Sequence, residues 1–122
     1  MRNEKLFVFF GATGNLFSEK IFPAFYHLIR RKKIDHFHIL SIGRRFSDGQ
    51  AYRSFLSNSL VKKIPDLDWS LLDYLFQRTT YFQGNIDNPL SFMSIISQCH
   101  LLDYQEILFY LSTLPSLYTK VL

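Results

Sequence analysis

Residues 6–17 read LFVFFGATGNLF. The first five form an uninterrupted apolar run, which is typical of a strand buried on both faces of a parallel sheet. Gly11 ends this run, and between Ile21 and Ile29 apolar residues recur at three- and four-residue spacing, which predicts an amphipathic helix. A glycine-rich turn between a buried strand and a helix is the place where a dinucleotide-binding fold has its phosphate turn.

The rest of the chain alternates between the same two patterns. Three further strands are predicted at residues 37–42, 79–82 and 107–111. Helical patterns occupy residues 49–63, 69–76 and 89–99, and another helix can begin at Pro115. Parallel neighbours need a crossover, so this order predicts an α/β fold with a Rossmann-like, mainly parallel sheet flanked by helices. The last helix is too short to cover its face of the sheet. We therefore expect residues 1–122 to be an incomplete domain, truncated from something longer.

Composition narrows the class of protein. The chain has 122 residues, 48% of them apolar, which suits one compact domain, and its longest apolar run is far too short to cross a membrane. The net charge of +4 comes partly from Arg30–Lys33, which we interpret as the last turn of a helix rather than as a nucleic-acid site. The single cysteine, Cys99, allows no intrachain disulfide, which suits the cytoplasm.

The turn at residues 11–14 suits phosphate binding for physical reasons. Glycines let the backbone turn tightly and approach a pyrophosphate, while free N–H groups and the positive end of the helix dipole face the anion. The Thr13 hydroxyl can add one donor. Phe17 stands where a small residue usually lets helix and strand pack closely, so we expect the helix to approach differently or to hold Phe17 out of that contact.

A second signal follows the second predicted strand, at Gly43-Arg44-Arg45. In a dinucleotide-binding fold this position faces the adenosine ribose, where a carboxylate selects a free 2′-hydroxyl and an arginine accommodates a 2′-phosphate. Two arginines and no carboxylate stand here, which favours NADP over NAD. The alternative is a solvated basic turn.

Other chemistry has little support in the sequence. His36 and His38 alternate on a predicted strand and could face one side, but no third ligand has suitable spacing, so we expect no metal site. No Ser/His/Asp or Cys/His arrangement can be argued either.

Taken together, the motifs resemble the start of glucose-6-phosphate dehydrogenase. The family pattern G-A-S/T-G-D-L-A precedes K-L/I-Y/F-P-A-L, and here residues 11–16 read GATGNL and residues 20–25 read KIFPAF. Gly-Arg at 43–44 is similar to the family's A-R, YFQGNID at 81–87 to its Y-x-x-G-x-Y/F-D, and LFYLS at 108–112 to its L-F-Y-L-A. The resemblance covers essentially the whole chain, in order.

This resemblance implies an NADP-binding domain of an enzyme that oxidises glucose 6-phosphate to 6-phosphogluconolactone in the pentose phosphate pathway. The implied pyrophosphate-binding residues are Gly11, Ala12, Thr13, Gly14, Asn15 and Leu16. By the same resemblance Arg44 would hold the 2′-phosphate, and Tyr118 would line the cofactor site. Lys20 matches the family lysine that lies between cofactor and sugar phosphate, where it would position the substrate.

Several departures from the family pattern matter. Asn15 replaces an aspartate, Phe17 replaces an alanine, and Leu114-Pro115 replaces a Pro-Pro pair. The family's E-K-P segment, its H-Y-L-G-K-E motif with the catalytic histidine, and its large sheet domain have no counterpart in residues 1–122. We therefore expect this chain alone to bind NADP weakly and to be inactive.

Two alternatives stay open at this stage. A short-chain reductase can also begin with G-A-T-G, but the Tyr-x-x-x-Lys pair that it needs is absent from the sequence. A vestigial, non-catalytic interaction module would explain Asn15 and Phe17, and an incompletely covered sheet would make it a homo-oligomer. Lys20 and Arg44 argue against this second alternative.

Overall fold

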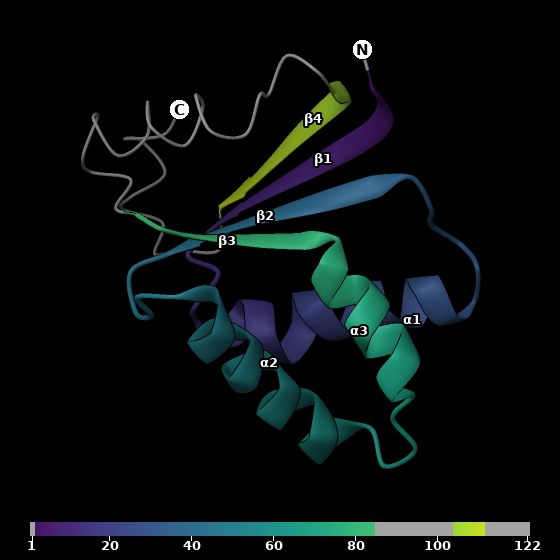
Figure 1. Ribbon diagram of the computed structural model, residues 1–122, viewed down its shortest axis with the longest axis vertical. Helices are drawn as coiled ribbons and strands as arrows, with labels where there is room; N and C mark the ends of the chain where they lie inside the picture. Colours follow the sequence, from purple (N-terminus) through teal and green to yellow (C-terminus); the bar gives the residue numbers. More distant parts are fainter. Residues whose placement is uncertain (1, 85–103, 112–122) are drawn as a thin grey trace.

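The described residues form a sheet of four parallel strands, in the order β3-β2-β1-β4, with helices packed on one face (Figure 1). The computed structural model describes residues 2–84 and 104–111. The strands are β1 (Arg2–Phe10), β2 (Phe37–Gly43), β3 (Thr79–Gln83) and β4 (Tyr104–Leu111). The helices are η1 (Phe17–Ile21), α1 (Phe22–Arg30), α2 (Gly49–Lys63) and α3 (Trp69–Gln77). The predicted α/β class with a Rossmann-like parallel sheet is confirmed.

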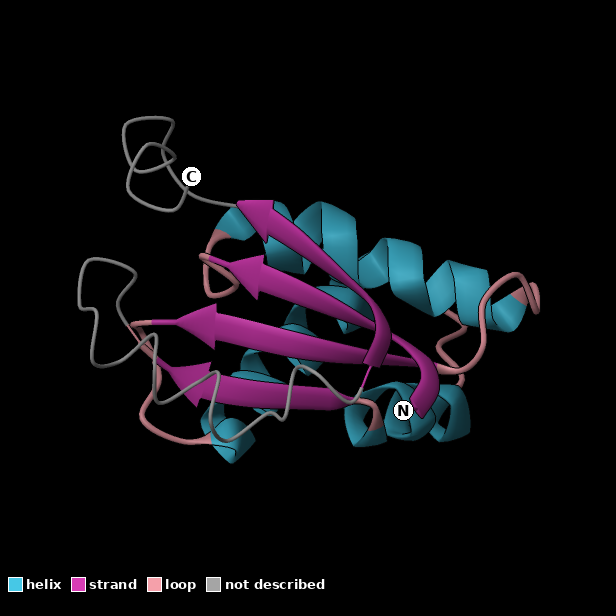
Figure 2. Ribbon diagram, turned by 90° about the horizontal axis from the view of Figure 1, so that it is seen from above, coloured by secondary structure: helices cyan, strands magenta, loops and turns pink. Residues whose placement is uncertain are grey.

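The sheet has two distinct faces. Helices α1, α2 and α3 lie together on one of them, and all four strands point toward the same edge of the sheet (Figure 2). On the opposite face, Val8 of β1 pairs with Leu40 of β2, and Phe10 pairs with Ile42. These four side chains are all buried. Both faces of the central strands are therefore apolar, as the uninterrupted run in β1 predicted.

Aromatic rings fill the layer between the sheet and the helices. Phe25 of α1 lies against Phe7, Phe9 and Phe37, with ring centroids 5.2, 5.9 and 5.8 Å away. Phe22 stacks on Phe76 of α3 at 5.6 Å, which joins the two helices. The aromatic richness of the sequence therefore serves the core, and ring pairs of this kind add to the stabilisation gained from buried area.

The helix after the glycine turn begins with a π-helical segment, η1. The N–H of Phe22 donates to the carbonyl of Phe17, five residues earlier. Phe17 is fully buried, and its ring packs edge-on against Phe9 at 5.0 Å and faces Tyr52 at 6.4 Å. The wider turn thus accommodates a large ring between strand and helix. Of the two sequence expectations, the altered approach of the helix is the one the structure shows.

Side-chain caps begin the two later helices. Asp48 accepts a hydrogen bond from the N–H of Ala51 at 2.8 Å, as the predicted helix start requires, and Asp68 accepts from Ser70 and Leu71. Asp68 is itself held, because its own N–H donates to the Tyr26 hydroxyl at 2.9 Å.

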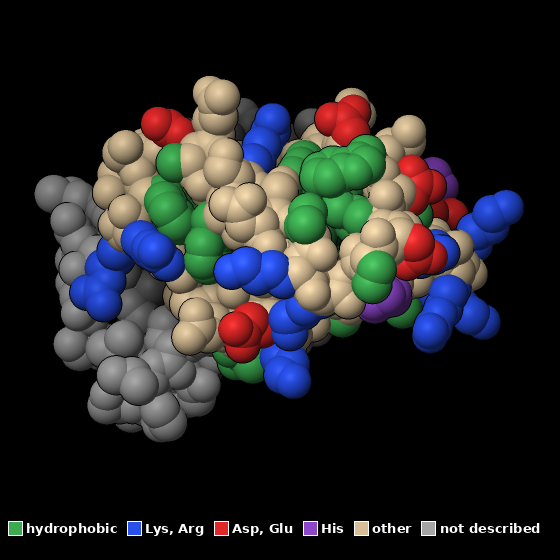
Figure 3. Space-filling view, turned by 90° about the horizontal axis from the view of Figure 1, so that it is seen from below, with side chains coloured by type: hydrophobic (Ala, Val, Ile, Leu, Met, Phe, Trp, Pro, Cys, Tyr) green, Lys and Arg blue, Asp and Glu red, His purple; other side chains and the backbone are tan. Residues whose placement is uncertain are grey.

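The outer surface of the helical layer mixes hydrophobic side chains with Lys and Arg (Figure 3). Trp69 and Leu16 are the most exposed large hydrophobic residues of the described chain. Within residues 2–84 and 104–111, no helix combines the length and the apolar character that crossing a bilayer requires. The helices predicted at 89–99 and after Pro115 lie outside the described residues.

Replacing Phe17 by alanine is expected to lower the free energy of unfolding by about 3–5 kcal/mol, because it leaves a cavity beside Phe9 and Tyr52. Urea denaturation followed by circular dichroism measures this. Leu16→Ala is the matched control, since the adjacent Leu16 side chain is 54% exposed and its loss should cost less than about 0.5 kcal/mol. Similar losses in the two variants would contradict the placement of Phe17.

Candidate functional site

The glycine turn lies where the direction of the sheet's connections reverses. β2 and β4 pair with opposite sides of β1, so the order of the strands in the sheet reverses between β1 and β4. In open α/β sheets this point, at the carboxyl ends of the strands, is where ligands bind. Residues 11–16 begin directly at the end of β1 and therefore occupy it.

Short backbone contacts hold the turn in place. Gly11 has a φ of 74°, which side chains disfavour, and its carbonyl accepts from the N–H of Gly14 at 3.1 Å. Ala12 is fully buried, and both of its backbone groups are used. Its N–H donates to the carbonyl of Ile42 at 3.0 Å, and its carbonyl accepts from the Tyr52 hydroxyl at 3.0 Å. Ala12 therefore anchors the turn to β2 and α2.

The next residues offer free donors. Among the described residues, the N–H groups of Thr13, Asn15 and Leu16 have no hydrogen-bond acceptor, and no side chain caps the start of η1. Asn15 and Leu16 are exposed, and Thr13 is half-buried. Unpaired N–H groups at an uncapped helix start fit the pyrophosphate of a dinucleotide. Phe17 does not obstruct them, because its ring is buried in the core.

Thr13 also joins the turn to the second predicted part of the site. A Cβ added at Gly43 would overlap Cγ2 of Thr13 and would lie 2.9 Å from its Oγ1. Gly43 is the last residue of β2 and immediately precedes Arg44. The absence of a side chain at Gly43 therefore lets the glycine turn and the arginine loop lie in contact.

The loop that carries the two arginines is held by β3. The Tyr81 hydroxyl accepts from the N–H of Phe46 at 3.2 Å and lies 2.7 Å from the Phe46 carbonyl. The Gln83 side chain donates to the Arg44 carbonyl at 3.2 Å, and the N–H of Gly84 donates to the Gly43 carbonyl at 2.9 Å. The backbone around Arg44 is therefore fixed to the edge strand.

The structure separates the roles of the two arginines. The Arg45 guanidinium lies 5.0 Å from the ring centroids of both Phe46 and Phe55, a cation–π arrangement that occupies it within the fold. Arg44 is exposed, and its guanidinium has no ion pair or hydrogen bond to any described residue. Arg44 is therefore the guanidinium available to an anionic ligand at the end of β2.

Lys20 lies in η1 and is exposed. Its ammonium has no ion pair with a carboxylate of the described chain. It belongs to the helical segment that begins at the glycine turn, which places its backbone close to the candidate cofactor site. Tyr118 lies outside the described residues, so its role stays a prediction.

Sequence reasoning missed two tyrosines that organise this site. Tyr52 lies in the helix predicted at residues 49–63, where the sequence indicated no role in the site, yet its hydroxyl anchors Ala12, and Tyr81 holds the arginine loop. Burial raises the pKa of the Tyr52 phenol well above its ordinary value, and burial also raises the pKa of Tyr81. Both phenols therefore stay neutral and able to donate. The one available signal was a hydroxyl on an otherwise apolar helix face.

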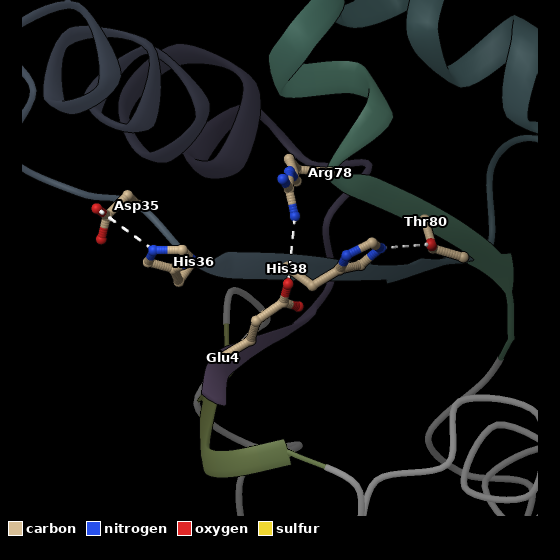
Figure 4. A network of polar contacts seen from close by, with 6 residues as sticks. All are labelled: Glu4, Asp35, His36, His38, Arg78 and Thr80. Atoms are coloured by element: carbon tan, nitrogen blue, oxygen red, sulfur yellow. Dashed lines mark hydrogen bonds and ion pairs between the residues drawn. The ribbon is translucent and has the colours of Figure 1, made fainter. Parts of the chain in front are cut away.

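The side chains of the two histidines considered as metal ligands point toward different partners (Figure 4). The prediction that His36 and His38 alternate on a strand is wrong, because β2 begins at Phe37 and His36 has a φ of 49°. His36 lies 3.8 Å from Asp35, and His38 bonds Thr80 at 3.3 Å. No group of three potential metal ligands occurs among the described residues.

Comparisons with known proteins match the chain to one family. Residues 8–122 match the family described as glucose-6-phosphate dehydrogenase, NAD binding domain. The glucose-6-phosphate 1-dehydrogenase of Chlamydia pneumoniae is 29% identical, over 96% of this chain and 24% of that protein. The enzyme of that name from Borreliella burgdorferi is 28% identical, over 94% and 23%. This chain thus spans about a quarter of the length of the curated relatives it matches.

Solved structures show the same fold. Glucose-6-phosphate 1-dehydrogenase from Mycobacterium avium has a TM-score of 0.86 at 23% identity, covering 99% of this chain and 26% of that one. A glucose-6-phosphate dehydrogenase in complex with its substrate glucose-6-phosphate has a TM-score of 0.84 at 22% identity, covering 98% and 26%.

Replacing Gly43 by alanine is expected to lower the free energy of unfolding by about 1–3 kcal/mol, because the new methyl group overlaps Thr13. Adding Thr13→Ala should recover part of this loss, since it removes Oγ1 and Cγ2. Urea denaturation measures both effects. Gly49→Ala is the control, because a Cβ there meets nothing within 4 Å. If the double variant is no more stable than Gly43→Ala, the contact is not the cause.

Stability is expected to fall as the pH rises above about 10, the ordinary pKa of a tyrosine. The folded chain holds Tyr52 and Tyr81 protonated where the unfolded chain releases these protons. Their stabilisation is therefore fully present below the unfolded pKa and is lost above it. Denaturant titrations at a series of alkaline pH values should show a shallower decline in Tyr52→Phe. Equal slopes in the two proteins would contradict the burial argument.

Proposed function

The chain belongs to the glucose-6-phosphate dehydrogenase family, and on that basis we propose that residues 1–122 form the NADP-binding part of such an enzyme. The domain that this chain matches takes a nicotinamide dinucleotide, which supplies the hydride acceptor when bound. The short-chain reductase alternative is wrong, because the family match covers residues 8–122. The complete reaction that we propose is oxidation of glucose 6-phosphate to 6-phosphogluconolactone.

The observation that carries the NADP assignment is the exposed Arg44 guanidinium on a fixed loop. A planar guanidinium offers paired donors to phosphate oxygens, which an additional 2′-phosphate can use. Residues 43–47 contain no carboxylate that would select the free 2′-hydroxyl of NAD. Because Thr13 contacts Gly43, this loop adjoins the turn whose free N–H groups suit the pyrophosphate.

In this proposal the residues of the glycine turn have different roles. Gly11 and Gly14 shape the backbone, Ala12 anchors it, and Thr13, Asn15 and Leu16 present donors to the pyrophosphate. Tyr118, outside the described residues, would line the same site.

Lys20 is proposed to position the sugar phosphate beside the bound cofactor. Its exposed ammonium follows the glycine turn by one to two helical turns and has no carboxylate partner in the described chain. A cation there would attract and orient a phosphorylated substrate. The base that accepts the hydroxyl proton belongs to a family motif without a counterpart in residues 1–122, so this chain by itself binds cofactor without completing the reaction.

A non-catalytic interaction module is the weaker reading. Its main support was that Phe17 could disable the phosphate turn, but Phe17 lies in the core. The shaped turn, and the adjacent Arg44 with no ion pair to any residue in 2–84 or 104–111, favour cofactor binding. The proposed location is the cytoplasm, in keeping with a single cysteine.

Calorimetric titration of the 122-residue chain with NADP and with NAD tests the proposal. NADP should bind more tightly, and Arg44→Ala should weaken NADP binding by about 10- to 100-fold while leaving NAD unchanged, because only NADP uses the lost charged hydrogen bonds. Arg45→Ala is the matched control, since Arg45 is already held on two phenylalanine rings and should leave the preference intact.

Two results would overturn the assignment. If Arg45→Ala rather than Arg44→Ala removes the preference for NADP, the 2′-phosphate site is misplaced. If neither nucleotide binds a chain whose circular dichroism shows it to be folded, the proposed function is rejected.

A further inference from the structure

Two stacked tyrosines link the separate parts of the cofactor site. The Tyr52 hydroxyl donates to the carbonyl of Ala12 in the glycine turn, and the Tyr81 hydroxyl contacts the backbone of the arginine loop at Gly43 and Phe46. The two rings lie face to face, with centroids 4.4 Å apart and planes 22° from parallel. One aromatic pair therefore touches both segments that the proposed function assigns to NADP.

We propose that the Tyr52–Tyr81 pair is a positioning device for the cofactor site, in which Tyr52 holds the glycine turn that both nucleotides use and Tyr81 holds the Arg44 loop that helps determine the preference for NADP. This inference rests on the proposed function. In this proposal neither tyrosine contacts the cofactor. Tyr52 acts through Ala12, and Tyr81 acts through the loop that carries Arg44.

The hydrogen bond from the Tyr52 hydroxyl to the Ala12 carbonyl is buried, so its loss would not be compensated by water. Tyr52 is 1% exposed and Ala12 is fully buried, so water cannot replace the hydroxyl as partner of the Ala12 carbonyl. A buried carbonyl left unpaired is costly, and the turn would shift to relieve it. Because Thr13 follows directly, any such shift moves the N–H groups proposed to bind the pyrophosphate.

Tyr81 acts on a different part of the ligand. Its hydroxyl accepts from one N–H and lies within hydrogen-bond distance of two carbonyls, all belonging to the loop at residues 43–46. Without it, this backbone keeps the contacts from Gln83 and Gly84 but loses its only described hydrogen bonds at Phe46. Arg44 would then sample more positions, and ordering it would cost more on binding.

The two hydroxyls therefore predict different binding defects. NADP and NAD share the pyrophosphate, so Tyr52→Phe should weaken both nucleotides by a similar factor, about five- to tenfold. Only NADP has the 2′-phosphate, so Tyr81→Phe should weaken NADP by about fivefold and leave NAD unchanged. Both affinities come from the same calorimetric titrations, performed well below the unfolding temperature of every variant.

Tyr26→Phe provides the matched control. Tyr26 is also fully buried, and its hydroxyl also bonds a backbone group, the N–H of Asp68 at the start of α3. A merely structural role for Tyr52 would make Tyr52→Phe behave like Tyr26→Phe, with lower stability and unchanged nucleotide affinity. That result, or an equal loss of NAD and NADP affinity in Tyr81→Phe, would overturn the proposal.

Hydrogen exchange in the free chain separates this inference from the proposed function. Tyr52→Phe should speed exchange of the Ala12 and Gly14 amides, and Tyr81→Phe that of the Phe46 and Gly84 amides. Tyr81→Leu removes the stacked ring as well, so it should speed exchange in both segments. If Tyr81→Leu leaves Ala12 and Gly14 unchanged, the coupling is refuted even when nucleotides bind. If exchange follows the prediction but the wild-type chain binds no nucleotide, the proposed function fails and, with it, the role of the pair in NADP preference.

Discussion

The position of Ala12 is the constraint on which the candidate site depends. This residue sits at the carboxyl end of the central strand, immediately after a glycine in the left-handed region, with both backbone groups buried and paired. One partner belongs to β2 and the other to α2, so the turn is held from two directions. The position of Ala12 fixes the groups that a ligand could contact. The N–H groups that have no acceptor among the described residues follow Ala12 directly, and Thr13 brings the turn into contact with Gly43 and the arginine loop.

Large rings shape the elements around that anchor. Where a small residue would let strand and helix lie close together, Phe17 fills the space and touches Phe9 and Tyr52. The added volume is accommodated by the wider turn of η1, so the helix still begins at the glycine turn, and its first N–H groups have no acceptor within the part of the chain that the structure describes. The residue that departs from the family pattern therefore lies in the packing beneath the site, and its ring does not cover the exposed Asn15 and Leu16.

Much of this arrangement could be predicted from local patterns. The periodicity and the stops around 49–63 predicted the observed bounds of α2, and the glycine turn was placed correctly between β1 and its helix. β1 begins at Arg2, earlier than the apolar run suggested, because pairing with β4 extends it. The packing of Phe17 on Tyr52 and the hydroxyl contacts of Tyr52 and Tyr81 join residues 35 to 40 positions apart, which no local pattern encodes. His36 was misassigned because alternation was read across the start of β2.

The strand order has a consequence for how the chain is assembled during synthesis. β1 is synthesised before the other three strands but lies in the interior of the sheet, and Phe10 is opposite Leu111 of β4. β1, β2 and β3 can pair once residues 2–83 have left the ribosome, whereas the other edge of β1 stays without its β4 partner until residues 104–111 have also emerged. During that interval an apolar strand with open hydrogen-bonding groups is exposed to neighbouring nascent chains. Slower synthesis of residues 84–111 is therefore expected to lengthen the interval in which this edge can pair with another chain.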